Sequence, residues 1–208
     1  MEVKIIALAR NDIQKSGGIL GKAFQNDPAM LMMLAESGAE ERIESSAKLF
    51  VNQLLACLRN GSPMIVKDTT RILSAFSLYP PGTYPIPLTE QIKMILVTVL
   101  KASLFSRQTW LALNRGIKLL DEMKKKHPKN PHYYLEVLGV EPSYQGKGIG
   151  SMILKSINEK ADKEGVGCYL ETAQPRNLPL YKRFGYQIID QKIILGVTLW
   201  FMWRNQGL

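Results

Sequence analysis

The feature that most constrains this chain is a loop with three glycines at alternate positions, in the stretch VEPSYQGKGIGSMIL over residues 140–154. The loop follows the hydrophobic run YYLEVLGV and leads into a segment whose apolar residues recur at helical spacing. The first N–H groups of a helix have no intrahelical partner, and glycine lets an anion approach them without a Cβ in the way. The pattern therefore predicts an anion site at a helix start, suited to a diphosphate.

Two familiar phosphate loops fit this stretch poorly. A Walker A loop needs Gly-Lys followed by Ser or Thr, whereas Lys147 is followed by Gly148. A dinucleotide fingerprint needs G-x-G-x-x-G, whereas the glycines here run G-x-G-x-G and lie late in the chain. A glycine-rich turn also occurs for backbone geometry alone, so the loop does not decide the function by itself.

Hydrophobic patterns along the rest of the chain predict strands mixed irregularly with helices. We expect strands over 3–9, 63–67, 71–79, 133–140, 168–173, 186–193 and 197–204, and helices over about 12–24, 40–59, 88–126, 148–163 and 179–184. Asp27-Pro28 is expected to stop the first helix, and residues 80–87 form a proline-rich loop. Residues 133–173 form a βαβ unit with a right-handed crossover. Hairpins beside a crossover indicate an α/β or α+β fold with a mixed sheet.

Composition narrows the class of protein without deciding it. The chain has 208 residues, of which 46% are hydrophobic, and a formal net charge of +9. It can bury a full core and is not disordered. The charge suits a nucleic-acid binder, a binder of anionic surfaces, or an enzyme with a phosphate-bearing ligand. No interleaved aromatic and basic pattern is present, and the lysines at 124–126 indicate a solvated helix end.

Cysteine spacing and hydropathy predict a reduced intracellular protein. Cys57 and Cys168 lie far apart without a close Cys or His partner, so we expect two buried thiols, no zinc site and no metal. The apolar runs at 5–9 and 94–100 are too short for a signal peptide or a membrane span. We expect a single cytoplasmic domain that binds neither membrane nor nucleic acid.

The glycine loop also fits a third pattern, Gln-x-x-Gly-x-Gly/Ala, through Gln145, Gly148 and Gly150. With YLEVLGV before it and CYLETAQPRNLPLYKRFGY and LWFMWR after it, the chain resembles the GNAT superfamily of N-acetyltransferases, in its puromycin N-acetyltransferase-like branch. The similarity is close over about 132–204 and looser before it, and residues 88–126 have no counterpart.

The resemblance implies an α/β (α+β) fold with a mixed, mostly antiparallel central sheet flanked by helices. It also implies a splayed pair of parallel strands that binds acetyl-CoA. One domain would span 1–208, with acceptor-site elements in 1–130 and the acetyl-CoA-binding core and closing strands in 131–208.

The resemblance also assigns residues to the cosubstrate acetyl-CoA. In the family, pantetheine pairs with the splayed strand, backbone amides of the loop hold the pyrophosphate, and an Asn at the following short helix meets the pantetheine arm. Two assignments have alternatives, since Lys147 also suits a solvated loop and Asn177 suits a helix N-cap. The positions carried over are Leu138, Gly139, Val140, Gln145, Gly146, Lys147, Gly148, Ile149, Gly150, Ser151, Asn177 and Tyr181.

For catalysis, Tyr181 matches the family's tyrosine, a general acid for the thiolate leaving group, with a packed core tyrosine as the alternative. The base is open: Glu136 is the first choice, His132 the second, and Glu171 a third that also suits a structural role. Strict strand alternation would put His132, Tyr134 and Glu136 on one face with Leu138 and Val140. The resemblance implies that the Val140 N–H stabilises the oxyanion.

The function implied is acetyl-CoA-dependent N-acetylation of a primary amine of a small molecule, by direct attack in a ternary complex. A CoA-binding regulatory module and a basic nucleic-acid-binding protein are the alternatives. The acceptor and the oligomeric state, monomer or homodimer, stay open. Trp110, Trp200 and Trp203 suit either an acceptor pocket or the core.

Overall fold

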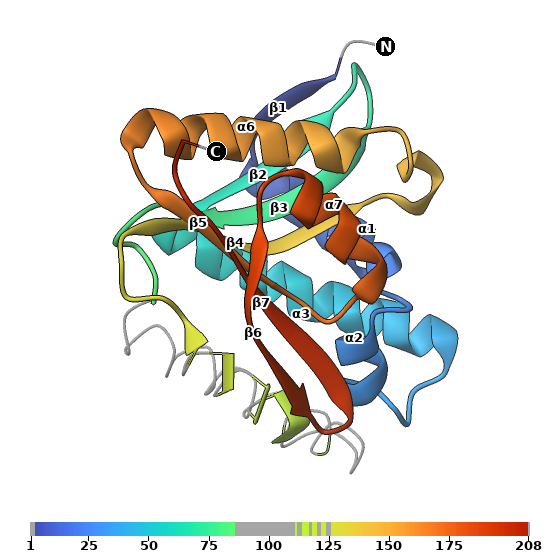
Figure 1. Cartoon of the computed structure of the whole chain (residues 1–208). Coiled ribbons are helices and arrows are strands. Elements are labelled where there is room, and N and C mark those ends of the chain that lie inside the picture. The colour runs from blue at the N-terminus through green and yellow to red at the C-terminus, as the bar shows by residue number, and fades with distance from the viewer. Residues whose placement is uncertain are drawn as a thin grey trace.

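The computed structural model of the chain describes residues 3–85, 111, 114–116, 118, 119, 122, 123 and 126–207. Within these residues, seven strands form one sheet in the order β1-β2-β3-β4-β5-β7-β6 (Figure 1). The strands are β1 (Lys4–Ala7), β2 (Ser62–Lys67), β3 (Ile72–Tyr79), β4 (His132–Val140), β5 (Gly167–Thr172), β6 (Gln187–Ile194) and β7 (Val197–Arg204). Only β4 and β5 pair in parallel within this sheet.

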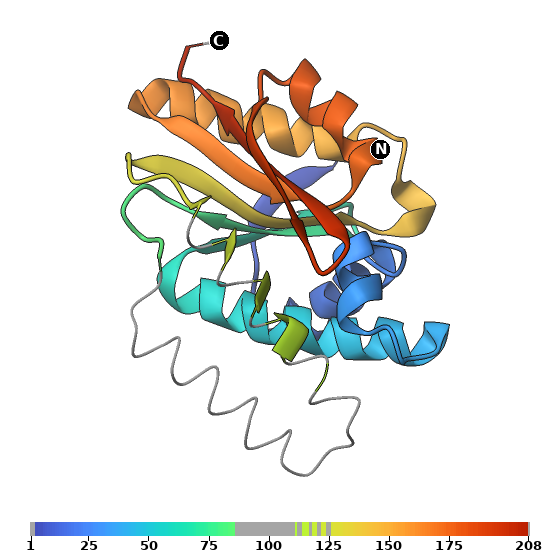
Figure 2. The same cartoon turned by 60° about the horizontal axis from the view of Figure 1, so that its bottom comes forward.

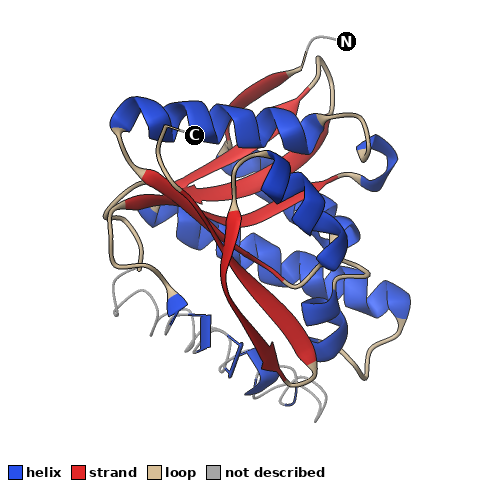
Figure 3. Ribbon diagram, in the orientation of Figure 1, coloured by secondary structure: helices blue, strands red, loops and turns tan. Residues whose placement is uncertain are grey.

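Helices cover both faces of the sheet, as Figures 2 and 3 show. The helices α6 (Ile149–Glu164) and α7 (Leu178–Arg183) lie on one side, which we call the α6 face. The helices α1 (Ile13–Ala23), α2 (Pro28–Met33) and α3 (Ala39–Asn60) lie on the other, which we call the α3 face. The mixed, mostly antiparallel sheet between two helical layers confirms the predicted fold class.

Apolar side chains fill both layers. On the α6 face, Ile153 and Leu154 of α6 are fully buried against Leu135 and Leu170 of the sheet. On the α3 face, Leu20, Phe50, Leu54 and Ile65 belong to one buried cluster. Burial of each such side chain contributes about 1.5–3 kcal/mol, so the helical spacing of these residues is enough to fix which side of each helix meets the sheet.

The predicted strands are all present, with ends that differ by one or a few residues from the sequence-based ranges. The antiparallel pairs β2–β3 and β6–β7 and the parallel pair β4–β5 are also as predicted. Of the helix predicted over 88–126, the described residues 111, 114–116, 118, 119, 122, 123 and 126 are helical. The rest of that range, Trp110 included, lies outside the described residues.

The Asp27-Pro28 pair does end the first helical segment, but it also starts an unpredicted helix, α2. The Asp27 side chain accepts hydrogen bonds from the N–H groups of Ala29 at 2.9 Å and Met30 at 3.4 Å. Pro28 occupies the first helical position, where its missing N–H has no intrahelical acceptor to lose. The same dipeptide that stops one helix is therefore a start signal for the next.

A buried ion pair ties the last strand to α6. Arg204, whose side chain is 2% exposed, donates from both terminal nitrogens to the Asp162 carboxylate at 2.7 and 2.8 Å. Asp162 also accepts from the backbone N–H of Gly207 at 2.8 Å. The bidentate geometry fixes the end of β7 against the helix that follows the glycine loop.

The part of the chain that the structure describes contains neither a membrane-spanning helix nor a cluster of metal-ligating side chains. Among the helices that the structure describes, none combines the length and apolar character needed to cross a bilayer. The same residues bring together no group of three or more His, Cys, Asp or Glu side chains with the proximity that a metal ion needs.

Candidate active site at the splayed strand pair

The parallel strands β4 and β5 part from each other halfway along β4. They pair from His132 with Gly167 to Leu135 with Leu170. Beyond that point β4 stays paired with β3 as far as Val140, and β5 stays paired with β7 as far as Thr172. We call this divergence the splay. Main-chain groups on the β5 side of β4 have no neighbouring strand in the splay, which leaves them available to an extended ligand.

A β-bulge marks the start of the splay. On β3, Ser77 pairs with Val137 and Leu78 pairs with Leu135, so Glu136 is an extra residue with no partner opposite. The bulge breaks the alternation of β4. Tyr134 and Val137 both belong to clusters on the α3 face, whereas Leu138 and Val140 pack on the α6 face.

The prediction that Glu136 shares a face with Leu138 and Val140 is therefore wrong. Strict alternation ignores the inserted residue. Glu136 acts electrostatically on Tyr79, Tyr84 and Cys57, side chains that belong to or pack with the α3-face cluster.

Main-chain direction alternates through the splay. The carbonyl of Gly139 accepts from the Ser74 hydroxyl at 2.8 Å, and the N–H of Glu141 donates to the Leu73 carbonyl at 2.9 Å. Both therefore face β3, and the intervening Val140, like Leu138, faces the splay. The Gln145 side-chain amide donates to the Val140 carbonyl at 3.0 Å, as expected for a carbonyl that points away from β3.

Gly139 is needed for close packing. A Cβ built on it would lie 2.6 Å from Leu20 Cδ2 and 3.1 Å from Ala23 Cβ, both on α1. The glycine thus lets α1 approach the outer half of β4. Its main chain faces β3, so its part in a ligand site is to hold the strand in place.

The glycine loop requires glycine at two positions for its backbone. Gly146 and Gly148 have φ of +75° and +82°, and Gly148 is the residue before α6. No side chain caps α6, whose first N–H groups therefore have no capping partner. Gln145 to Gly148 are exposed. The loop thus presents bare amides and the positive end of a 16-residue helix.

Two basic side chains lie beside this helix start. Lys147 Nζ lies 4.6 Å from the centre of the Tyr144 ring, which restrains it over the loop. Arg183 of α7 donates to the Ser151 hydroxyl at 3.2 Å. Arg183 was not predicted, because it is 32 residues away in sequence and reaches the loop only through the packing of α7.

Tyr181 is buried in the core cluster against which Leu138 and Val140 pack. Burial, with a further contribution from the charge of Asp27, raises its pKa to about 12. Its ring meets that of Tyr186 edge-on at 6.1 Å. A phenol of this kind keeps its proton at neutral pH and is able to give it to a stronger base.

Asn177 precedes α7 but makes no capping hydrogen bond with its side chain. It is half-buried. The N-cap alternative for Asn177 is therefore not what the structure shows, and its amide is not engaged at the helix start.

Two carboxyl groups meet at the start of the splay. Glu136 and Glu171 each follow the last paired residues, Leu135 and Leu170, and we call them the acid pair. The Oε2 atom of Glu136 and both carboxyl oxygens of Glu171 are buried without a hydrogen-bond partner. Burial raises the pKa of Glu136 to about 7 and, with a contribution from the charge of Glu136, the pKa of Glu171 to about 8.

Weaker interactions oppose these shifts only in part. The Gln53 side chain lowers the pKa of Glu136, and the Tyr169 and Tyr134 hydroxyls lower that of Glu171. The Tyr169 hydroxyl nevertheless has no hydrogen-bond partner of normal geometry, although the residue is fully buried.

Tyrosine rings surround the acid pair. The Tyr84 ring lies 4.6 Å from that of Tyr134 and 5.3 Å from that of Tyr79. The Tyr134 ring lies 5.6 Å from that of Tyr169. Burial raises the pKa of each of these four tyrosines well above its usual value, and the carboxyl charges raise it further.

His132 lies at the opposite end of β4 from the glycine loop. Its Nδ1 contacts the Asn130 carbonyl, and its Nε2 lies 3.1 Å from Nε2 of His127. Burial lowers the pKa of both imidazoles, that of His127 to about 3. His132 is about 20 Å along the strand from Leu138, at about 3.3 Å per residue. The structure therefore brings Glu136, and not His132, to the splay.

The remaining candidates have structural positions. Cys57 and Cys168 are free and buried, as predicted, and burial raises their pKa to about 12 and about 11. Trp200 packs against the α6-face core, and Trp203 donates from its indole N–H to Asn205 at 2.7 Å.

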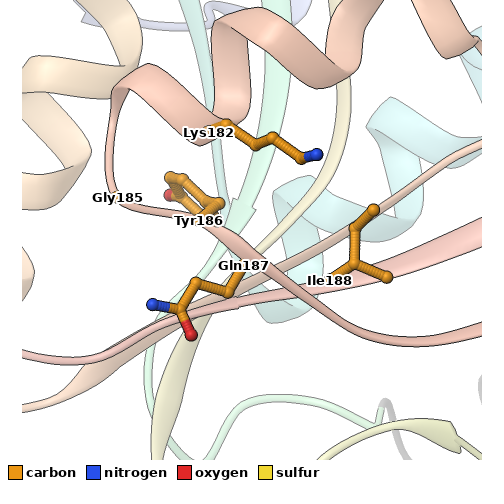
Figure 4. A pocket seen from close by; sticks show the side chains of 5 residues that line it. All are labelled: Lys182, Gly185, Tyr186, Gln187 and Ile188. Carbon is orange, nitrogen blue, oxygen red and sulfur yellow. The ribbon is translucent and has the colours of Figure 1, made fainter.

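A surface pocket of about 420 Å³ lies between α7 and β6. It is lined by Lys182, Gly185, Tyr186, Gln187 and Ile188 (Figure 4). It contains one basic side chain and no carboxyl group, so it lacks the acid and base that the splay provides.

Comparison with known proteins gives a family match in the same region. Residues 115–186 match the model of the Acetyltransferase (GNAT) family. The uncharacterized N-acetyltransferase C550.08 of Schizosaccharomyces pombe is 32% identical over 85 residues, 39% of this chain and 34% of that protein. The uncharacterized N-acetyltransferase YjcF of Bacillus subtilis is 30% identical over 71 residues, 34% of this chain and 51% of that protein. The chain thus aligns with about a third and about half of these relatives.

Solved structures with a similar fold align with 99–100% of this chain at low sequence identity. An acetyltransferase from Corynebacterium glutamicum, described as histone acetyltransferase HPA2 and related acetyltransferase, has a TM-score of 0.70, 20% identity and coverage of 100% and 98%. Arylalkylamine N-acetyltransferase 2 from Aedes aegypti has a TM-score of 0.68, 11% identity and 99% coverage of both chains. PaiA N-acetyltransferase from Thermoplasma acidophilum, in complex with coenzyme A, has a TM-score of 0.56, 14% identity and 99% coverage of both.

The matched residues 115–186 include β4, the splay, the glycine loop and Tyr181. The shared fold extends through the described residues. Residues 115–186 are thus similar to the Acetyltransferase (GNAT) family, and the described residues share the fold of solved acetyltransferases.

Proposed function

We propose that the chain is an acetyl-CoA-dependent N-acetyltransferase that acts on a primary amine of a small molecule by direct attack in a ternary complex. The observation that carries the proposal is the splay itself. It starts at a bulge that carries a buried carboxyl group and ends at a glycine loop that opens a helix. One end therefore suits an amine and the other a diphosphate.

Acetyl-CoA is proposed to lie along the splay. The Leu138 and Val140 main chains would pair with pantetheine, while Gly139 holds the strand against α1. The amides from Gln145 to Ser151 would hold the pyrophosphate, with charge from Lys147 and Arg183. The Asn177 amide, which makes no cap, would meet the pantetheine arm. No step of this proposal needs a metal ion.

The proposed reaction moves two protons and one acetyl group. Glu136 takes a proton from the acceptor ammonium, and the free amine attacks the thioester carbonyl carbon. Collapse of the tetrahedral adduct re-forms the carbonyl and breaks the C–S bond. Tyr181 gives its proton to the departing thiolate, and the second proton lost by the nitrogen restores the tyrosine through solvent.

The Val140 N–H is the expected oxyanion donor, but the Leu138 N–H faces the same splay and lies closer to Glu136. Two residues of strand separate Leu138 from Glu136, about 7 Å, against about 13 Å for Val140. An amine held at Glu136 would therefore meet a carbonyl at Leu138 more readily, and we propose Leu138 as the first oxyanion donor.

The acceptor class is supported by the names of proteins with the same fold. These include agmatine N-acetyltransferase and the polyamine N-acetyltransferase of Drosophila melanogaster. The puromycin N-acetyltransferase-like branch rests on motif spacing in residues 132–204 alone. A cytoplasmic location and a single domain with an acceptor half and a donor half are likewise proposals.

The proposed function is tested by thermal unfolding with and without acetyl-CoA, followed by detection of released CoA thiol over a panel of primary amines. Acetyl-CoA at about 100 times its Kd stabilises the folded state by about 2.7 kcal/mol. No shift in melting temperature at saturation would refute the cosubstrate. A shift without turnover of any amine would point to a CoA-binding module instead.

A further inference from the structure

The acid pair is an unusual feature for an unliganded protein core. Two carboxyl groups occupy equivalent positions on neighbouring strands, on the same face of the sheet, at the point where the strands part. Three of their oxygens are buried without a hydrogen-bond partner. An uncompensated buried carboxylate costs several kcal/mol, so such a group either holds a proton or has a partner that binds there.

The described residues supply no cation to the acid pair. The side chains that act on Glu136 are Gln53 of α3 and the nearby tyrosines and Cys57. Those that act on Glu171 are Tyr134, Tyr169, Tyr84 and Glu136. No arginine or lysine is among these groups. The fully buried Tyr169 hydroxyl acts on Glu171 and likewise has no hydrogen-bond partner of normal geometry among the described residues.

We propose that Glu136, Glu171 and the Tyr169 hydroxyl form one ammonium-binding subsite, and that the acceptor is an alkylamine that is cationic at neutral pH. This inference rests on the proposed function and adds Glu171 and Tyr169 to it. The ammonium group has three donors for these oxygens, and the Tyr84 and Tyr134 rings provide walls that attract a cation.

The chemistry of the subsite favours an ammonium over a divalent metal. Mg²⁺ and Ca²⁺ take six or more oxygen ligands, whereas two carboxyl groups and one phenol supply fewer. Aromatic walls also suit an organic cation. An arylamine or an amide nitrogen is uncharged at neutral pH, so neither would compensate the acid pair.

The two carboxylates have different tasks in this arrangement. Glu136, at the bulge, takes the proton: R–NH3⁺ and Glu136 carboxylate become R–NH2 and Glu136 carboxylic acid. Glu171 holds the alkylammonium before this step, in the ionised form that a bound cation favours against its raised pKa of about 8. Glu171 is therefore a binding carboxylate that selects cationic acceptors.

A matched pair of isomeric probes tests the subsite: 2-phenylethylamine, which is cationic at neutral pH, and 4-ethylaniline, which is not. We expect calorimetry to show binding of 2-phenylethylamine to the wild-type protein, in the presence of CoA, and none of 4-ethylaniline at the same concentrations. Affinity should rise between pH 6 and 8 as the acid pair loses protons. Equal affinity for the two isomers would overturn the proposal.

Glu171→Gln keeps the shape of the side chain and removes its charge. It should weaken 2-phenylethylamine binding at least about 30-fold, the usual minimum for loss of one member of a buried, hydrogen-bonded charge pair. The control is Glu159→Gln, the same change at an exposed i,i+4 pair with Lys155 on α6, which should have no effect. Unchanged affinity in a folded Glu171→Gln protein would refute the subsite.

Steady-state kinetics distinguish failure of the ammonium subsite from failure of the proposed function on which it rests. The kcat/KM for 2-phenylethylamine should fall in Glu171→Gln, while the KM for acetyl-CoA stays unchanged. Failure of acetyl-CoA to bind would refute the proposed function, and the amine titrations would still decide the subsite. Acetylation of 4-ethylaniline as fast as 2-phenylethylamine would confirm the function and refute the subsite.

Discussion

The two ends of the splay offer different kinds of chemical group to a ligand. At the glycine loop, the groups on offer are backbone amides from one contiguous stretch, with a helix start behind them. At the acid pair, they are side chains from β4, β5 and the segment after β3, brought together by strand register and a bulge. The proposed donor site thus lies within one motif, whereas the proposed acceptor site combines residues that are far apart in the sequence.

This difference teaches where each kind of substitution should act. Changes at the loop should alter acetyl-CoA affinity and leave the choice of amine unchanged. Changes at the acid pair should alter the choice of amine and leave acetyl-CoA affinity unchanged. Tyr181 belongs to the core cluster against which Leu138 and Val140 pack, and it should affect the chemical step alone.

The largest effect is expected for Tyr181→Phe, which removes the proposed proton donor and keeps the buried ring. Loss of a general acid lowers kcat by about 100-fold or more. Acetyl-CoA binding, measured by calorimetry, should change less than about threefold. A kcat equal to that of the wild type would remove Tyr181 from the mechanism.

A somewhat smaller loss is expected for Glu136→Gln, about 100-fold in kcat at neutral pH. His132→Gln is the comparison variant. His132 is a neutral, polar side chain on the same strand as Glu136, but it lies about 20 Å from Leu138. It should retain kcat within about threefold. The reverse order of the two variants would contradict the assignment of Glu136 as the base.

The third prediction concerns stability and pH. The pKa values of Glu136 and Glu171 are raised in the folded state, to about 7 and about 8. The folded protein therefore holds protons that the unfolded chain has released, and its stability falls as pH rises toward 8. The lowered pKa values of His127 and His132 act oppositely, but only below about pH 6.5.

Between pH 6.5 and 8, unfolding of the unliganded protein by denaturant should therefore become easier, by about 2 kcal/mol. The tyrosines and Cys57 that face the acid pair stay protonated over this range, because their pKa values are raised. Glu171→Gln should remove most of the slope. A wild-type slope equal to that of the variant would contradict the raised pKa of Glu171.

The smallest effect is expected for Gly148→Ala at the loop. A side chain at φ of +82° costs about 1–2 kcal/mol of backbone strain and places a Cβ among the amides. We expect the KM for acetyl-CoA to rise about tenfold, which corresponds to about 1.4 kcal/mol.

The matched control is Gly196→Ala in the β6–β7 turn. Gly196 has φ of +83° and, like Gly148, open space around the added Cβ. The Gly196→Ala variant should lose a similar free energy of unfolding and keep the wild-type KM for acetyl-CoA. An equal rise in KM in both variants would show that the effect is strain and not ligand contact.

Most of the fold was predictable because local patterns carry it. Period-two and helical spacing located the strands and most of the helices, and QGKGIG with the Tyr181 motif predicted a donor site. Pro28 shows the limit of local signals, since the same residue stops one helix and begins another. Residues 86–110 are not among the residues that the structure describes, so the helix predicted there is not compared with the structure.

The acceptor end was less predictable for physical reasons. Sequence alone does not reveal a bulge, and one inserted residue at Glu136 turned its side chain away from Leu138 and Val140. The Glu136–Glu171 pairing depends on the parallel register of strands 35 residues apart, which no local pattern encodes. Arg183 reaches Ser151 through helix packing of the same long-range kind.

The central claim is most directly tested by incubating the protein with acetyl-CoA and 2-phenylethylamine and quantifying both products by mass spectrometry. The account predicts N-acetyl-2-phenylethylamine and free CoA in equal amounts, with turnover almost abolished in Tyr181→Phe. Tight binding of acetyl-CoA without an acetylated product from this or any other alkylamine would contradict it.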